Sequence, residues 1–174
     1  MQEGITKAYE LVRCKVSPSQ LFLDPTNPRL ITNWEQDREY GSKELTSDDV
    51  QAYVLDLVSR KEHAVRQLIA SIRAMGFIGG LHEMIVKRLP RGERFLVIEG
   101  NRRTAALQHL LSRSTELRPD VHESIKQIEV QEFIYHSNAH HSEEQVIDIL
   151  LGAIHIDGPK EWGALEKSYY IHKS

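Results

Sequence analysis

The chain has 174 residues, of which 40% are hydrophobic and 27% are charged, so one domain with a sizeable buried core is expected. Its formal net charge of -3 gives no general attraction to nucleic acid or to an anionic membrane, and anion binding therefore requires a local basic cluster. The single cysteine, Cys14, excludes an internal disulfide, and no apolar stretch or leader pattern indicates a membrane segment or secretion, so we expect a cytoplasmic protein.

The first half of the chain predicts a strand followed by helices. Apolar and polar residues alternate over 9–16, which is typical of a half-buried strand, and the prolines that follow indicate a stiff loop. Over 47–75 the apolar residues recur at steps of three and four, which predicts two helices with a break near 59–62, or one long helix. Ser47 or Thr46 is the expected N-cap, and Gly76 is the expected end of this helical region. The acidic stretch 35–49 is expected to be largely solvated loop.

The middle of the chain predicts a β-hairpin that leads into a helix. Two runs rich in β-forming residues lie within 83–100, separated by a turn that contains Pro90 and Gly92. The second run ends at Gly100, and the residues after it have helical periodicity, so a helix should begin within one or two residues of this glycine.

The last part of the chain predicts one more strand and further helices. Residues 125–135 alternate again, and Ser142 can cap a helix that continues to residue 154. A helical pattern that begins at Trp162 is still running at residue 174, which suggests that the chain is an excised fragment.

The junction "VIEGNRRTAAL", 97–107, is the most informative stretch. A helix N-terminus presents backbone N–H groups and about half a positive charge, so it attracts anions. Gly100 allows close approach of a ligand or a positive φ, and Arg102 and Arg103 add planar charged groups that suit phosphate oxygens. The alternative is that the glycine only turns the corner and that the arginines pair with nearby acids such as Glu99.

Three short boxes resemble motifs of the ParB N-terminal domain, also called the ParB/sulfiredoxin fold. "GNRRTAAL" resembles the family's glycine–glutamate–arginine–arginine box, and "NPR", 27–29, resembles its early proline–arginine box. "LGAIHIDGPKEWGALEKSYY", 151–170, occupies the place of the third nucleotide motif. The resemblance covers roughly 12–170 and implies an α/β domain, with a small mixed sheet flanked by helices, over 1–140. A C-terminal helical extension, 141–174, would then continue into a segment outside this chain.

The resemblance also implies a ligand. ParB domains hold CTP with magnesium in the arginine box, and relatives of the same fold use ATP or ADP. Carried over to this chain, it implies CTP or ATP with Mg²⁺ as the cofactor. The implied phosphate-binding residues are Gly100, Asn101, Arg102, Arg103, Thr104 and Arg29, and 76–83 would form a wall of the same pocket.

The departures from the family pattern concern the metal and the chemistry. Asn101 stands where ParB carries an acid, and Gly152 and Ala153 stand where it carries a glutamate–asparagine pair, which weakens a magnesium site because Mg²⁺ prefers carboxylates. A displaced carboxylate such as Glu99 or Asp157 could serve instead. Sulfiredoxin has its catalytic cysteine at the position of Asn101, so sulfinic-acid repair is disfavoured.

Three classes of function follow. The leading hypothesis is a nucleotide-binding switch or regulator in a DNA-associated protein. We expect this protein to be a homodimer. If it binds DNA, we expect the contact to be made by a segment outside this chain. The second is an enzyme, a phosphotransferase, NTPase (a hydrolase of CTP or ATP) or nuclease, with Glu99, Glu83 or His155 as the base. The third is a protein-interaction module that binds no nucleotide.

Overall fold

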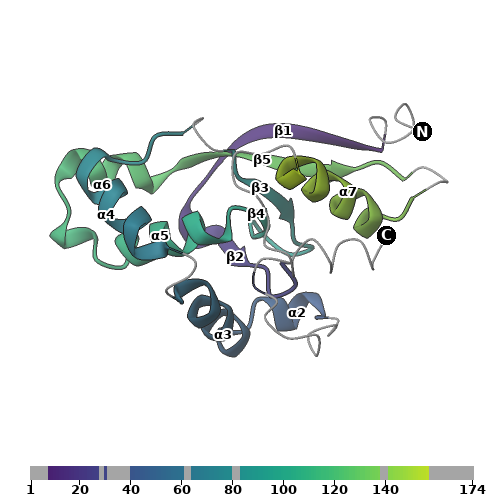
Figure 1. Ribbon diagram of the computed structural model, residues 1–174, viewed down its shortest axis with the longest axis horizontal. Helices are drawn as coiled ribbons and strands as arrows, with labels where there is room; N and C mark the ends of the chain where they lie inside the picture. Colours follow the sequence, from purple (N-terminus) through teal and green to yellow (C-terminus); the bar gives the residue numbers. More distant parts are fainter. Residues whose placement is uncertain are drawn as a thin grey trace.

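The computed structural model describes residues 8–27, 30, 40–60, 64–79, 83–137 and 141–156, and its side chains are described as far as residue 154. Within these residues, five strands form one mixed sheet in the order β1-β5-β3-β4-β2. The strands are β1 (Tyr9–Val16), β2 (Leu21–Leu23), β3 (Ile85–Arg88), β4 (Phe95–Glu99) and β5 (Ile128–Tyr135). The predicted α/β class, a small mixed sheet flanked by helices, is confirmed (Figure 1).

The helices of the described residues alternate with these strands along the chain. They are α2 (Ser42–Leu45), α3 (Asp48–Ser59), α4 (Val65–Met75), α5 (Asn101–Leu111), α6 (Pro119–Lys126) and α7 (Glu143–Ile156), with short 3-10 turns η1 (Pro18–Gln20) and η4 (Ser114–Glu116). In this part of the chain, no helix is both long enough and apolar enough to span a bilayer.

The sheet combines local and distant pairings. β1 runs antiparallel to β5 from Tyr9 opposite Tyr135 to Val16 opposite Ile128, and β3 and β4 form the predicted antiparallel hairpin. The remaining two pairings, β3 with β5 and β2 with β4, are parallel and join segments far apart in sequence. The hairpin thereby occupies the middle of the sheet, and β4 carries the chain from there to Gly100.

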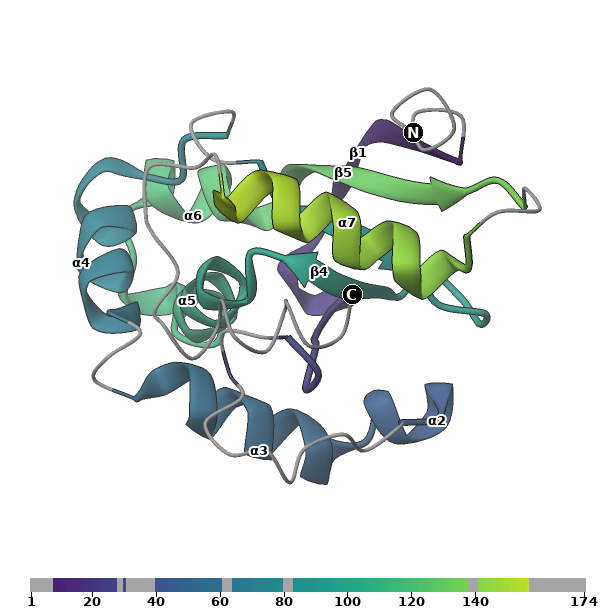
Figure 2. The ribbon, with the colours of Figure 1, turned by 45° about the vertical axis from the view of Figure 1, so that its right-hand side comes forward.

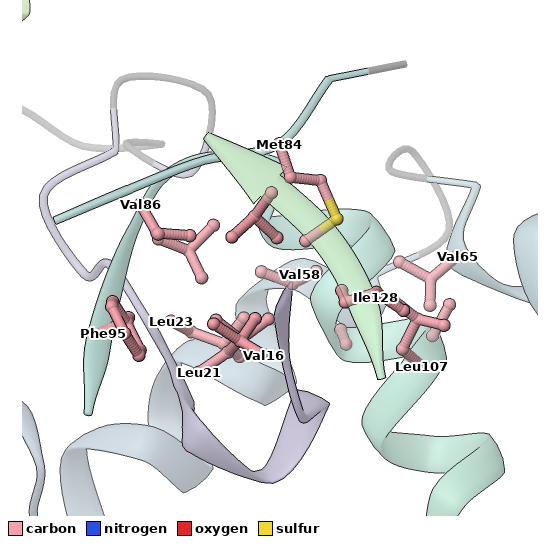
Figure 3. Close-up of a cluster of buried hydrophobic side chains, with 14 of the residues drawn as sticks. Val16, Leu21, Leu23, Val58, Val65, Met84, Val86, Phe95, Leu107 and Ile128 are labelled. Atoms are coloured by element: carbon pink, nitrogen blue, oxygen red, sulfur yellow. The ribbon is translucent and has the colours of Figure 1, made fainter. Parts of the chain in front are cut away.

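Both faces of the sheet are covered, because successive side chains of a strand point to opposite faces. In β4, Val97 points into a large core that it shares with α3, α4, α5 and α6, whereas Ile98 points into a smaller core under α7. Figure 3 shows side chains from strands and helices meeting in the larger core. Figure 2 shows α7 lying along β5 and β4.

α7 is held on the sheet by apolar and polar contacts. Its buried residues Val146, Leu150 and Leu151 pack in the smaller core. At its start, Lys87 Nζ on β3 lies 2.6 Å from Glu143 Oε2, and Ser142 accepts a hydrogen bond from Gln145 N, which confirms the predicted cap. The first helix of the expected C-terminal extension therefore packs directly against the strands that lead to Gly100.

Several sequence-based expectations are confirmed. The strand over 9–16 forms as predicted. Two helices, not one, occupy 48–75: Ser47 Oγ accepts from Val50 N to cap α3, and Gly76, with φ of 80°, ends α4 by donating to Ile72 O.

Other expectations are corrected. The stretch after β1, expected to be a stiff loop, contains η1 and β2, because Leu21 and Leu23 gain a parallel partner in β4. The expected acidic loop contains α2. The strand expected over 125–135 begins at Ile128, because Ile125 and Lys126 end helix α6, whose Ile125 is buried in the larger core. The helix expected from Trp162 lies outside the described residues.

We expect the central packing of α5 to dominate the stability of the larger core. Leu110 is fully buried on α5, so Leu110→Ala should lower the free energy of unfolding by about 3 kcal/mol, since it removes buried methyl groups and leaves a cavity. Leu55→Ala is the matched control because Leu55 is exposed on α3, and it should change stability by less than about 0.5 kcal/mol. Denaturant unfolding measures both, and equal losses would contradict this view of the core.

Candidate phosphate-binding site

Gly100 joins β4 to α5 with a backbone conformation that favours glycine. It is the N-cap of α5, with φ of 111° and ψ of 17° in the left-handed region. A Cβ atom added there would lie 2.9 Å from Cγ of Met84, which is itself buried. Both the backbone angle and the contact therefore require glycine at this corner.

The first turn of α5 is electropositive. Gly100 supplies no side-chain cap, and the turn contains no acidic residue but does contain Arg102 and Arg103. The first N–H groups of a helix have no partner within the helix, and the helix dipole adds partial positive charge at this end. Glycine, helix start and two half-buried arginines thus occupy one corner, as the sequence predicts.

Two carboxylates lie at the same end of the hairpin. Glu99 is the last residue of β4, is only 7% exposed, and stands opposite Ile85 in the sheet. Glu83 lies just before β3, and its carbonyl oxygen accepts a hydrogen bond of 3.3 Å from Arg103 Nη1. The structure therefore brings Glu83 and Arg103 together, 20 positions apart in sequence.

Glu83 has a charged partner of its own. Its carboxylate lies 3.7 Å from Arg13 Nη2 on β1, and both side chains are more than half exposed. An ion pair in such a solvated position contributes little to stability and can exchange partners readily.

The side chains of Asn101 and Thr104 point into the protein. Asn101 is 5% exposed; its Oδ1 accepts from Asp24 N at 2.9 Å, and its Nδ2 donates to Val97 O at 3.4 Å. Thr104 is fully buried, its N–H donates to Gly100 O, and its Oγ1 has no hydrogen-bond partner among the described residues. At these two positions, the side chains belong to the interior of the fold.

A turn after β2 lies directly against this corner. Asp24 is bonded to Asn101 as described, and Asn27, 4% exposed, donates from Nδ2 to Ile98 O at 3.0 Å. The "NPR" box thus begins beside the start of α5. Arg29 itself and the side chain of His155 lie outside the described residues, as does Asp157.

Sequence reasoning missed Asp24 and Met84 at this corner, and it included Asn27 only as the first residue of the "NPR" box. An Asp-Pro-Thr-Asn turn is visible in the sequence as a turn signal, but its position beside Gly100 depends on the parallel pairing of β2 with β4. At Met84, the sequence offers no indication of a role except its position at the start of a run of β-forming residues.

No group of three or more histidine, cysteine, aspartate or glutamate side chains that could hold a metal ion occurs among the residues described. Acidic residues near the α5 start include Glu99, Glu83 and Asp24. Magnesium bound together with phosphate prefers carboxylate ligands of this kind.

Cys14 lies on β1, half-buried against the larger core. Burial raises the pKa of its thiol, the carboxylate of Glu132 raises the pKa further, and Arg88 acts in the opposite direction. Arg88 is bonded to Glu132 through Nε and Nη2, at 2.7 and 2.9 Å. The thiol is therefore held in its neutral, weakly nucleophilic form.

Comparison with known proteins gives similarity in structure but not in sequence. No family model matches the chain, and no curated protein matches it in sequence. Among solved structures, the chain is similar to the C-terminally truncated chromosome-partitioning protein ParB from Caulobacter crescentus, complexed with CTP-gamma-S, with 17% identity and a TM-score of 0.42. The similarity covers 91% of this chain and 59% of that chain.

This neighbour is a ParB protein, and ParB is the family whose boxes the sequence resembles. The chain spans less than two thirds of the neighbour's length.

We expect Gly100→Ala to lower the free energy of unfolding by about 2 to 4 kcal/mol, because it combines a left-handed backbone with a clash against Met84. Gly41→Ala is the control, since no atom lies within 4 Å of the added Cβ and its φ is -69°. Denaturant unfolding of the two variants should differ clearly. An unchanged stability of Gly100→Ala would contradict the conformation of this corner.

We also expect the Cys14 thiol to react slowly with a disulfide reagent at neutral pH, several-fold more slowly than in the unfolded chain. In the folded chain, the pKa of this thiol lies above the usual value of 9.0. The neutral thiol therefore makes its full contribution to the free energy of unfolding below pH 9, and this contribution is lost as the pH rises through the folded pKa. Labelling rates with and without denaturant test this, and equal rates would contradict a half-buried thiol held in its neutral form.

Proposed function

We propose that the chain is a nucleotide-binding module of the ParB kind that holds the phosphates of CTP or ATP at the start of α5. The observation that carries the proposal is the corner at Gly100, where a helix without a side-chain cap begins with two arginines in its first turn. Backbone N–H groups, the helix dipole and guanidinium groups all favour an anion there.

The resemblance of three sequence boxes to ParB motifs supports a nucleotide as the source of that anion. Under this proposal, Arg102 and Arg103 bind phosphate oxygens with their side chains, and Gly100 and Asn101 contribute backbone N–H groups. Arg29 joins them from the early box, and Mg²⁺ accompanies the phosphates if Glu99 or Glu83 supplies a ligand.

The fold offers a route by which nucleotide binding could act on a partner surface. Ile98 on β4 packs in the smaller core with Leu150 and Leu151 of α7, two positions before Gly100. We propose that nucleotide binding at the corner shifts the position of α7, so that the module works as a switch within a homodimeric, DNA-associated protein.

Isothermal titration with CTP, ATP and ADP, each with Mg²⁺ and with EDTA, tests the proposal. We expect at least one nucleotide to bind, and Arg103→Ala to weaken it roughly 10- to 100-fold, because it removes a charge-assisted hydrogen bond to phosphate. Arg91→Ala is the control. Arg91 carries the same charge and is exposed in the turn before β4, whereas Gly100 follows the other end of β4.

Equal weakening by Arg103→Ala and Arg91→Ala would show that only the net charge matters and would contradict a site at the corner. No binding of any of the three nucleotides would reject the proposed function and favour a protein-interaction module.

A buried carboxylate next to the corner favours a second candidate function. Glu99 lies one residue before Gly100 and is almost fully buried, so it could act as a base towards a water or hydroxyl group beside bound phosphate. In that case the chain is an NTPase or a phosphotransferase, with Glu83 and His155 as the other candidate bases.

Phosphate release from CTP and ATP distinguishes the two candidates. We expect no release over hours if the module is a switch. Release that is lost in Glu99→Gln, while nucleotide affinity is retained, would instead establish the enzyme.

A further inference from the structure

Two buried carboxamides join the turn after β2 to the corner at Gly100. Asn101, the first residue of α5, accepts from Asp24 N through Oδ1, at 2.9 Å. Asn27 donates from Nδ2 to Ile98 O on β4, at 3.0 Å. One bond runs from the turn to the helix and the other from the turn to the strand, so the turn is fixed to both arms of the corner.

The turn is also ordered internally. Asp24 Oδ1 accepts from both N and Oγ1 of Thr26, at 2.8 and 2.7 Å, and Asn27 O accepts from Leu30 N at 2.9 Å. Leu30 is buried in the larger core. Residues on both sides of the Pro-Arg pair are therefore anchored next to α5.

The chemistry of position 101 requires an amide. Its oxygen accepts from Asp24 N, while its nitrogen donates to Val97 O at 3.4 Å, and the side chain is only 5% exposed. A carboxylate could make the first bond but has no proton for the second, and it would bring a charge into the interior. Because both functional ends of the amide are engaged, Asn101 can reach a phosphate only through its backbone N–H.

We propose that Asn101 is a positioning residue of the nucleotide site, whose side chain holds the Asp24–Asn27 turn in register with the first turn of α5. This inference rests on the proposed function. It assigns the side chain of Asn101 to the alignment of this turn with the proposed phosphate-binding corner, two segments that are more than 70 positions apart in sequence. Without this alignment, the turn would no longer be fixed beside the first turn of α5.

The chain offers a matched control on the same helix. Gln108 Nε2 donates to Leu21 O at 2.7 Å and to Pro18 O at 3.1 Å, and so also ties α5 to the segment around β2. It lies about two turns beyond the corner. Gln108→Ala therefore removes a comparable bridge between the same two parts of the chain without touching the Asp24 turn.

Amide hydrogen exchange of the full chain without nucleotide tests the contact first. In Asn101→Ala, exchange of the Asp24 amide should become roughly 10-fold faster or more, because its acceptor is gone. The Gly76 amide, bonded to Ile72 O at 2.8 Å, should be unchanged. Asn101→Asp keeps the acceptor for Asp24 N but loses the bond to Val97 O and buries a charge, so it should lower stability while raising Asp24 exchange no more than Gly76 exchange. This variant carries the test if the alanine variant does not fold. Unchanged Asp24 exchange in Asn101→Ala, or a rise in Asn101→Asp that is larger at Asp24 than at Gly76, would overturn the assignment.

Titration with CTP and ATP then tests the positioning. We expect Asn101→Ala to weaken binding roughly 10-fold, at temperatures where circular dichroism shows the variant folded, and Gln108→Ala to bind as tightly as the native chain. Equal weakening by both variants, or none by Asn101→Ala, would overturn the inference. If the native chain binds no nucleotide, the proposed function fails, and the Asp24 exchange alone decides whether Asn101 positions the turn.

Discussion

Gly100 turns the chain from a strand in the sheet to the most buried helix of the fold, and its left-handed backbone fixes the angle between them. α5 contacts α3, α4 and α6 as well as β2 and β4, so this angle sets how the larger core closes. Met84 fills the space that a side chain at Gly100 would occupy. Because packing occupies one side of this corner, the placement of the α5 start and of its arginines depends on the same glycine.

The corner is assembled from segments that lie far apart in the chain. β2 brings the Asp24 turn alongside β4, the hairpin brings Glu83 beside Arg103, and both depend on pairings within one sheet. The opposite face of β4 supports α7. A ligand that moved the end of β4 would therefore change the packing of both cores. This coupling is the physical reason to propose a switch and not only a binding site.

The sequence predicted the parts of this fold whose signals are local. Alternation predicted β1, and two runs of β-forming residues around a turn predicted the hairpin. Helix ends were correctly predicted at Gly76, Ser142 and Gly100, and at Ser47 as one of two candidate caps, because caps act within one turn. β2 and α6 were missed since three residues of strand carry little pattern and Pro119–Lys126 is short. The inward side chain of Asn101 could not be predicted either, because it depends on Asp24, which becomes a neighbour only after β2 pairs with β4.

The central claim is that anions bind where the backbone turns at Gly100. The most direct measurement is an NMR titration of the ¹⁵N-labelled chain with CTP and with ATP, following each assigned backbone amide. We expect the largest shifts at Gly100, Asn101, Arg102 and Arg103, with smaller shifts in the Asp24–Asn27 turn. Shifts that saturate elsewhere while these amides stay unchanged would contradict it, as would the absence of any shift at millimolar nucleotide.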